Sequence, residues 1–365
     1  MDTARWAKPN ASKEVAGFTT IYSFKNVPDG AYPEGGLTSE NGVLYGTSWK
    51  GGANDQGTVF MATVTGHETV LYSFTGGSDG QEPQGAVVVN KRTVYGVTER
   101  GGSPGDGVVF AVTSGSGEQV LHAFTGGNDG SVPMSGLTLY KQRFYGSTVA
   151  GGASSDGTLF SVDPGGGYTQ GRAFNGGPND GARPAAPLSV IRDAIYGTTQ
   201  SGGAYGGGVL FVQDPEKGYS VIHSFGKGSD GTDPGNNGVT LLDHVVYGTT
   251  CAGGLTGRGT VFTVSASGTE RTLYNFGATH RDGTCPNGTL VSHLGVLYGV
   301  TAAGGAYNDG TVFSITARGR ERILHSFRGP QEGIPIGSLV FLSGKLYGVT
   351  SNAGVGYGTV FSLKL

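Results

Sequence analysis

The sequence predicts an all-β fold, a seven-bladed β-propeller with four antiparallel strands in each blade. Three observations predict it: a repeat of about 50 residues, four short strand patterns in each repeat, and no helical periodicity. A Tyr-Gly pair marks the repeat seven times, at Tyr45, Tyr95, Tyr145, Tyr196, Tyr247, Tyr298 and Tyr347. Repeats of this length that are built from strands alone are typical of propellers.

Two further series of residues keep the same step as the Tyr-Gly pairs. A phenylalanine follows Gly-Thr-Val or a close variant at Phe60, Phe110, Phe160, Phe211, Phe262, Phe313 and Phe361. Another ends each fourth strand pattern, at Phe24, Phe74, Phe124, Phe174, Phe225, Phe276 and Phe327. Within the first repeat the strand patterns cover residues 36–39, 43–48, 58–64 and 69–74. Glycine-containing turns separate them, since glycine adopts the positive φ that tight hairpins need.

The two ends of the sequence predict that the ring closes. A lone fourth-strand pattern at about residues 18–24 precedes the first repeat, and the last repeat, at about 335–365, stops after its third strand. Pairing of these fragments leaves no unpaired strand edge, whereas an open solenoid would need polar capping repeats. We therefore expect one propeller domain over residues 17–365 and a flexible N-terminal arm over residues 1–16.

Composition excludes several classes of protein. Roughly one residue in five is glycine, 71 of 365, yet the glycines follow no three-residue period and apolar residues are interspersed throughout. Only 14% of residues are charged and the net charge is −3, so no nucleic-acid partner is expected. No apolar run is long enough for a transmembrane segment. The N-terminus shows no signal-peptide pattern, as in the mature form of a secreted protein.

One repeat unit carries a resemblance to a known family. Leu-Tyr-Gly-Thr at 44–47 is followed by Gly51, Gly52 and Gly-Thr-Val-Phe at 57–60, and the same order recurs over 297–313. This unit resembles the GloVer repeat of bacterial proteins, which is named after Gloeobacter and Verrucomicrobia. The resemblance implies an exported protein, often with a C-terminal anchor that this chain lacks. It supplies no catalytic residues to carry over.

The two cysteines bear on the compartment. Cys251 follows the second strand of its blade and Cys285 follows a fourth strand, and these loops emerge on the same face of an up-and-down sheet. A disulfide between them is therefore expected, with two buried free thiols as the alternative. A disulfide favours an extracellular or periplasmic location.

Most titratable residues recur in the repeats, which favours a structural role. The acidic residue of the Asp-Gly turn recurs at Asp29, Asp79, Asp129, Asp180, Asp230 and Asp282, with Glu332 in the seventh copy. One carboxylate per loop supports a turn role, and calcium is only a weak alternative, so no cofactor is expected. His122, His223 and His325 occupy a slot held by tyrosine in other copies. Since His280 has no second histidine at ligand spacing, no zinc or iron site is expected.

Residues that break the repeat pattern are the candidates for function. They lie in the loops from strand four to strand one and from strand two to strand three, which gather on one face around the channel. The expected ligand-binding residues are Tyr32, Trp49, Lys50, Gln84, Glu99, Arg183, Asp233, Asn237 and Asn287. Aromatic rings beside carboxylates and amides suit a polyhydroxylated ligand. Trp49 covering a neighbouring loop, and Glu99 with Arg100 as a solvated pair, are the structural alternatives.

Three functions remain open from the sequence. The first is binding of a glycan or another surface ligand by a monomer. The second is a glycoside hydrolase that uses Glu34 and Glu82, or a polysaccharide lyase that draws on Tyr32, Arg100, Arg183 and His280. The third is a protein-interaction scaffold centred on Trp49.

Overall fold

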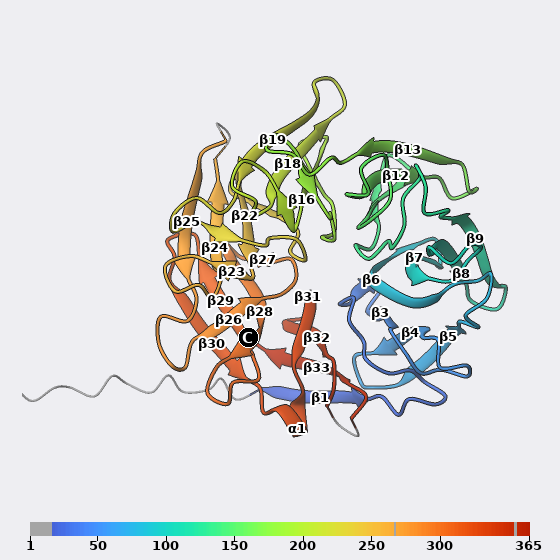
Figure 1. Ribbon diagram of the computed structural model, residues 1–365. Helices are drawn as coiled ribbons and strands as arrows, with labels where there is room; N and C mark the ends of the chain where they lie inside the picture. The colour runs from blue at the N-terminus through green and yellow to red at the C-terminus, as the bar shows by residue number, and fades with distance from the viewer. Residues whose placement is uncertain (1–16, 266–267, 354–355) are drawn as a thin grey trace, which may run out of the picture.

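A computed structural model describes residues 17–265, 268–353 and 356–365 of the chain. Seven antiparallel sheets stand around a central channel in the order of the sequence, so the seven-bladed propeller is confirmed (Figure 1). The one helix in the described part of the chain is a single turn, α1 (Gly329–Glu332). The arm expected over residues 1–16 lies outside the described residues.

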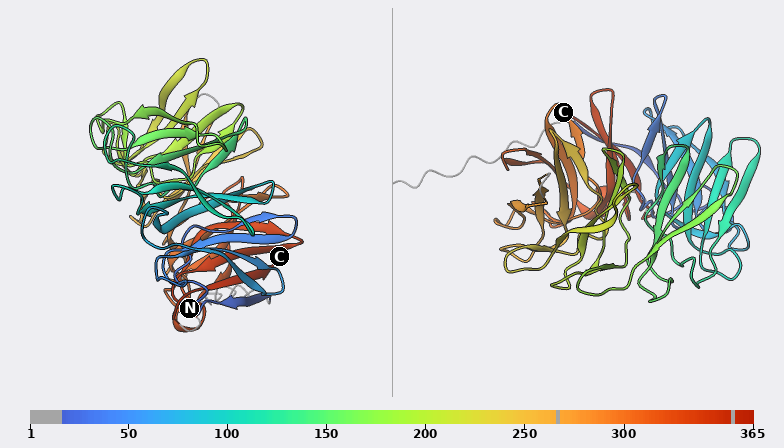
Figure 2. Two further views of the ribbon diagram at one scale, coloured as in Figure 1. Left: turned by 90° about the vertical axis from the view of Figure 1, so that its right-hand side faces the viewer. Right: turned by 90° about the horizontal axis from the view of Figure 1, so that it is seen from above.

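Each blade consists of four strands, of which the first lies beside the channel and the fourth at the outer rim. The strands of blades 1 to 4 are β2 (Thr38–Glu40), β3 (Val43–Ser48), β4 (Thr58–Thr63) and β5 (Glu68–Ser73); β6 (Gln81–Asn90), β7 (Thr93–Arg100), β8 (Val108–Thr113) and β9 (Gly117–Ala123); β10 (Thr138–Tyr140), β11 (Arg143–Thr148), β12 (Thr158–Val162) and β13 (Tyr168–Ala173); β15 (Ser189–Ile191), β16 (Ala194–Thr198), β18 (Val209–Asp214) and β19 (Gly218–Ser224). In the side views the sheets of neighbouring blades stand face to face (Figure 2).

The last three blades follow the same plan. Their strands are β21 (Thr240–Leu242), β22 (Val245–Thr250), β24 (Thr260–Val264) and β25 (Glu270–Asn275); β27 (Val291–His293), β28 (Val296–Gly304), β29 (Thr311–Thr316) and β30 (Glu321–Ser326); β31 (Pro335–Leu342), β32 (Lys345–Thr350), β33 (Thr359–Lys364) and β1 (Phe18–Ser23). Short strands pair the two kinds of loop in blades 4 to 6, namely β14 (Gly181–Ala182) with β17 (Ser201–Gly202), β20 (Gly231–Thr232) with β23 (Ala252–Gly253), and β26 (Gly283–Pro286) with β28.

The first strand of the chain closes the ring. β1 pairs antiparallel with β33, so that Phe18 lies opposite Leu363 and Ser23 lies opposite Thr359. Figure 1 shows the blue N-terminal strand beside the red strands of blade 7. Blade 7 therefore has its fourth strand, as the two end fragments of the sequence predict.

The core is divided among the junctions between blades. Seven clusters of buried apolar residues each join two neighbouring blades. A pair of phenylalanines, one from each blade, lies at every junction with its rings inclined at 60–72° and their centroids 4.9–5.4 Å apart. The two phenylalanine series of the sequence are these partners. Edge-to-face packing of this kind holds each blade at a fixed angle to the next.

The glycine of each Tyr-Gly pair makes room for one of these rings. A Cβ atom added at Gly46 would lie 2.7 Å from Cζ of Phe60, which is too close for any side chain. The same approach recurs between Gly248 and Phe262, at 2.4 Å. The Tyr-Gly pair is therefore a packing feature of the second strand.

The acidic residues of the Asp-Gly turns lie at the outer rim of the ring. Each accepts a hydrogen bond from a side chain on the preceding fourth strand, as Asp79 does from Tyr72 at 2.9 Å and Asp180 from Arg172 at 2.7 Å. The fourth strand of the next blade adds one more side chain beside each pair. The seven resulting groups, here called rim triads, are Tyr22–Asp29–Glu68, Tyr72–Asp79–Glu118, His122–Asp129–Tyr168, Arg172–Asp180–Tyr219, His223–Asp230–Glu270, Tyr274–Asp282–Glu321 and His325–Glu332–Phe18.

Candidate functional site

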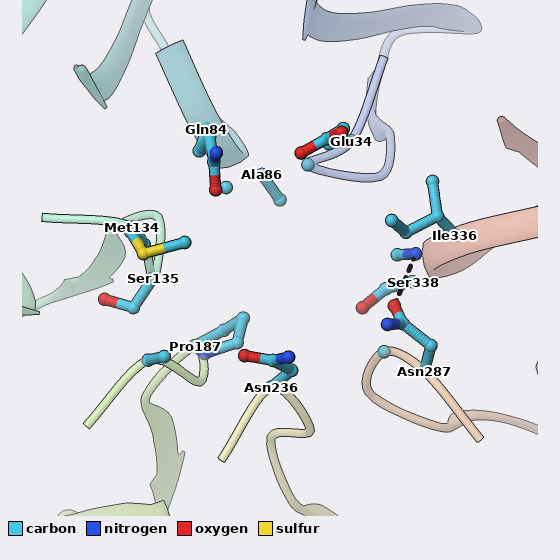
Figure 3. A pocket seen from close by; sticks show the side chains of 15 residues that line it. Glu34, Gln84, Ala86, Met134, Ser135, Pro187, Asn236, Asn287, Ile336 and Ser338 are labelled. Carbon is cyan, nitrogen blue, oxygen red and sulfur yellow. Dashed lines mark hydrogen bonds between the residues drawn. The ribbon is translucent and has the colours of Figure 1, made fainter. Parts of the chain in front are cut away.

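A cavity of about 200 Å³ lies where the loops that enter the first strands converge around the channel (Figure 3). Every blade contributes to its lining. The lining residues are Glu34, Gly35, Gln84, Gly85, Ala86, Met134, Ser135, Ala185, Pro187, Asn236, Asn287, Gly288, Ile336, Gly337 and Ser338. The backbone around the cavity therefore repeats seven times, whereas the side chains that line it differ among the blades.

A proline in each loop positions these lining residues, a feature that the sequence analysis missed. The prolines are Pro33, Pro83, Pro133, Pro184, Pro234, Pro286 and Pro335. In blades 1 to 6 the residue before the proline has a φ between 51° and 60°, as Tyr32 and Arg183 do. The side chain after the proline lines the cavity in six blades, and Asn236, one position further on, does so in blade 5. The recurrent proline with variable neighbours was the sequence signal for this site.

The carboxyl group in the cavity belongs to Glu34. Burial raises the pKa of Glu34, and the negative charge of Glu99 raises it further. Burial also raises the pKa of Glu99, while the neighbouring Arg100 opposes that shift. Glu99 accepts a hydrogen bond of 2.9 Å from Nε2 of Gln84, which itself lines the cavity. Glu99 is therefore the carboxyl group whose charge acts on Glu34 at this site.

Glu82 does not form the acid–base pair with Glu34 that the sequence suggested. Its carboxylate lies 2.6 Å from Nζ of Lys50 and 3.3 Å from Nε of Arg100. Because Lys50 lies in blade 1 and Glu82 enters blade 2, this ion pair joins two blades. Two cations neutralise Glu82, and it does not line the cavity.

The expected aromatic platform is absent from the cavity lining. The ring of Tyr32 packs edge-on against Tyr357, and Nζ of Lys50 lies 4.9 Å from the centre of the Trp49 ring. Neither Tyr32 nor Trp49 is among the lining residues. The indole nitrogen of Trp49 is buried without a hydrogen-bond partner in the described part of the chain. Trp49 is half-buried, and the alternative in which it covers a neighbouring loop stays a prediction.

Exposed tyrosines lie instead in the loops between strands two and three of blades 4 and 6. Tyr205 is 51% exposed and Tyr307 is 46% exposed. A cation lies over each ring, Lys227 at 5.8 Å and Arg328 at 4.8 Å. Other repeats carry small or polar residues at this position, and that difference was the sequence signal for them.

Two neighbouring asparagines in blade 5 have different surroundings. Asn237, expected to bind ligand, is 1% exposed, and its amide donates to the carbonyl groups of Thr249 and Pro286 and accepts from the N–H of Gly288. These bonds give Asn237 a structural role between blades 5 and 6. Asn236 is exposed and lines the cavity.

Of the remaining expected residues, one lines the cavity and the others lie outside it. Asn287 lines it, and its side-chain oxygen accepts a hydrogen bond of 3.0 Å from Gly337 N–H. Arg183 lies outside and donates to Gln200, which donates in turn to Asn236. Burial raises the pKa of Asp233, which lies near Arg183.

His280 lies exposed in the turn between β25 and β26, away from the cavity lining. The four residues suggested for a lyase, Tyr32, Arg100, Arg183 and His280, are all outside that lining.

Cys251 and Cys285 form a disulfide, which links the loops of blades 5 and 6 on the face of the cavity. Cys285 precedes Pro286 as Glu82 precedes Pro83, so the disulfide and the Lys50–Glu82 ion pair each link the loop before a proline to the preceding blade. A disulfide is compatible with an extracellular or periplasmic location. In the described residues no helix has the length and apolar character needed to cross a membrane.

A closed ring of seven repeated four-stranded sheets defines a β-propeller repeat protein. The chain belongs to the Gloeobacter/Verrucomicrobia repeat family, whose repeat matches residues 11–190 and 168–361. No curated protein matches the chain in sequence.

Two solved structures are similar to the chain at low sequence identity. One, from a study of two prolyl endopeptidases, is 14% identical with a TM-score of 0.51, and the match covers 87% of this chain and 46% of that one. The chain thus spans about half the length of that relative. The other, a protein of unknown function from Bacteroides thetaiotaomicron, is 13% identical with a TM-score of 0.47, over 98% of this chain and 99% of that one.

Proposed function

We propose that the protein binds the end of a glycan, or a similar polyhydroxylated ligand, in the cavity at the mouth of the channel. One observation carries this proposal: seven loops of nearly equal backbone place side chains of six different kinds around one cavity. A constant scaffold with variable side chains is the usual construction of a binding surface.

The lining suits a sugar because it is polar on some sides and apolar on others. Glu34, Gln84, Asn236 and Asn287 offer hydrogen-bond donors and acceptors for hydroxyl groups, while Met134 and Ile336 offer apolar contact for C–H groups. A volume of about 200 Å³ is below the roughly 300–1,000 Å³ of drug-sized sites. We therefore infer that one sugar residue enters the cavity and the remainder of the glycan lies on the surrounding loops.

Exposed Tyr205 and Tyr307 supply stacking surfaces further out, near the acidic turns of the outer rim. An exposed tyrosine ring offers a flat apolar face, and the cation beside each one adds an attraction for acidic groups. An exported protein of this family would meet glycans at a cell surface, which fits the disulfide of blades 5 and 6.

Titration calorimetry of the purified chain against a panel of neutral and acidic glycans tests the proposal. We expect saturable binding to one glycan class, and a loss of at least tenfold in affinity for Glu34→Gln and for Asn236→Ala. Thr279→Ala, an exposed turn residue outside the cavity, is the matched control and should bind as the wild type does. Flat isotherms across the panel, or equal affinity for all three variants, would contradict the proposal.

A glycoside hydrolase is a second candidate, supported by the Glu34–Glu99 pair. Two carboxyl groups with raised pKa values beside a cavity are suited to donating and accepting a proton at a glycosidic oxygen. Mass spectrometry of polysaccharides incubated with the chain would detect shortened products. Loss of these products in Glu34→Gln and Glu99→Gln, with unchanged melting temperature, would establish hydrolysis, and their complete absence from the wild type would leave binding alone.

A further inference from the structure

The rim triad between blades 4 and 5 differs from the other six in its chemistry. It combines His223 of β19, Asp230 of the following turn and Glu270 of β25. One ligand atom from each residue lies within 4.8 Å of the other two, and Nε2 of His223 lies 2.8 Å from Oδ2 of Asp230. No other triad places an imidazole beside two carboxylates.

We propose that His223, Asp230 and Glu270 bind a divalent transition-metal ion of the Zn²⁺ class, which joins the outer strands of blades 4 and 5. The three residues supply one neutral nitrogen and two carboxylate oxygens, and a water molecule completes a four-coordinate site. An imidazole ligand favours zinc, copper or nickel over calcium and magnesium, which prefer sites built from oxygen alone.

The charge of the triad supports a bound cation. Asp230 and Glu270 are both partly or largely shielded from solvent, and no lysine or arginine forms an ion pair with either in the described residues. Burial and the charge of Asp230 raise the pKa of Glu270 to about 7, while His223 partly opposes the shift. Two carboxylates this close together repel each other, and a metal ion bound to both would offset that repulsion.

The distances require only a small adjustment. Zinc–nitrogen and zinc–oxygen bonds of about 2.0–2.2 Å place tetrahedral ligand atoms roughly 3.4 Å apart. The His223–Asp230 pair, at 2.8 Å, must open slightly and exchange its hydrogen bond for bonds to the ion, and the glutamate carboxylate must rotate inward. The side chains of His223 and Asp230 are 21% and 9% exposed, which leaves a path for the ion and for its water ligand.

The alternative to a metal site is that this triad has only the structural hydrogen bond that the rim triads share. Other triads of the same chain suggest the variants that distinguish these two explanations. The triad of Tyr72, Asp79 and Glu118 has two carboxylates without an imidazole. The triad of His122, Asp129 and Tyr168 has an imidazole and one carboxylate. His223→Tyr and Glu270→Tyr therefore convert the proposed site into arrangements that this fold already accommodates.

Untagged full-length protein, stripped with a chelator and dialysed against Zn²⁺, tests the proposal by metal analysis and thermal melting. We expect one zinc ion per wild-type chain and a higher melting temperature with zinc than with chelator. Substituted Co²⁺ should give the intense visible absorption of a tetrahedral ion. His223→Tyr and Glu270→Tyr should remain folded and lose the zinc, the zinc-dependent rise in melting temperature and the cobalt spectrum.

A gain-of-site variant tests the composition of the triad directly. Tyr72→His places an imidazole beside Asp79 and Glu118, so the chain should then bind two zinc ions. A wild type without zinc, zinc retained by both tyrosine variants, or an unchanged stoichiometry in Tyr72→His would overturn the proposal. The readouts are independent of any glycan, so they stand apart from the test of the channel cavity.

Discussion

Single glycines in the second strands set the distance between blades. In Gly248→Ala the new methyl group would lie 2.4 Å from the buried ring of Phe262, so either the ring or the strand must move. We expect a loss of about 1–3 kcal/mol in the free energy of unfolding, measured by urea titration. Gly127→Ala is the control, because its Cβ would meet only an ordinary contact at 3.7 Å and its φ is not positive. Equal stability of the two variants would contradict this role for the glycine.

Variants of the adjacent Asn236 and Asn237 in blade 5 should affect ligand binding and stability differently. Asn237→Ala leaves the N–H of Gly288 and two carbonyl groups without partners in a buried position, so a loss of about 2–4 kcal/mol in stability is expected. Asn236→Ala should leave the unfolding curve within about 0.5 kcal/mol of the wild type. Calorimetry with the best glycan of the panel should show the opposite order, with affinity reduced by Asn236→Ala.

At the scale of strands, the rim triads make stability depend on pH. Burial and the nearby charge of Asp282 raise the pKa of Glu321 on β30 from 4.5 to about 8. Its Oε1 atom is buried without a hydrogen-bond partner among the described residues. The folded state therefore favours the protonated form of Glu321. Its contribution to the free energy of unfolding is fully present below pH 4.5 and is lost as the pH rises through about 8.

Thermal melts of Glu321→Gln at several pH values test this dependence. The wild type should lose on the order of 1 kcal/mol more than the variant between pH 5 and pH 9, because glutamine stays neutral. Glu216→Gln, which replaces an exposed carboxylate in a hairpin, should follow the wild type. A wild-type curve parallel to that of Glu321→Gln would show that the carboxyl group titrates normally.

The disulfide between blades 5 and 6 is the covalent link between adjacent loops. Cys251→Ser with Cys285→Ser opens a loop with a sequence separation of 34, and the chain-entropy model assigns about 3–4 kcal/mol to such a link. We expect a correspondingly lower urea midpoint for the double variant and for the reduced wild type. Reduction of the double variant should change nothing further.

For the molecule as a whole, the fold followed from the sequence and the site only in part. The period of the Tyr-Gly pairs and the incomplete end repeats fixed the number of blades and the pairing of β1 with β33, because both depend on local strand patterns. The sequence also predicted which loops share a face of the ring, since the order of the strands alone determines where each loop emerges.

Side-chain partners in the loops were beyond the sequence because they depend on contacts between blades. Glu82 looked like a partner of Glu34, but the cations Lys50 and Arg100 of the two flanking loops hold it. Asp230 follows His223 by seven residues, but the third member of the triad, Glu270, comes from the next blade. Such pairs form only when the ring is assembled, and a comparison of positions within one repeat does not reveal them.

The closure of the ring has a mechanical consequence. Because β1 and β33 run antiparallel, residues 17 and 365 lie at the same end of the strand pair. A force that pulls these residues apart peels the two strands, so their hydrogen bonds break one after another instead of sharing the load. In an optical trap with handles at these positions, the first event should be a small, low-force extension as blade 7 opens, ahead of the loss of the other blades. A disulfide between Gly17→Cys and Lys364→Cys, whose Cβ atoms would be neighbours, should carry the load directly between the two handles and abolish every unfolding event.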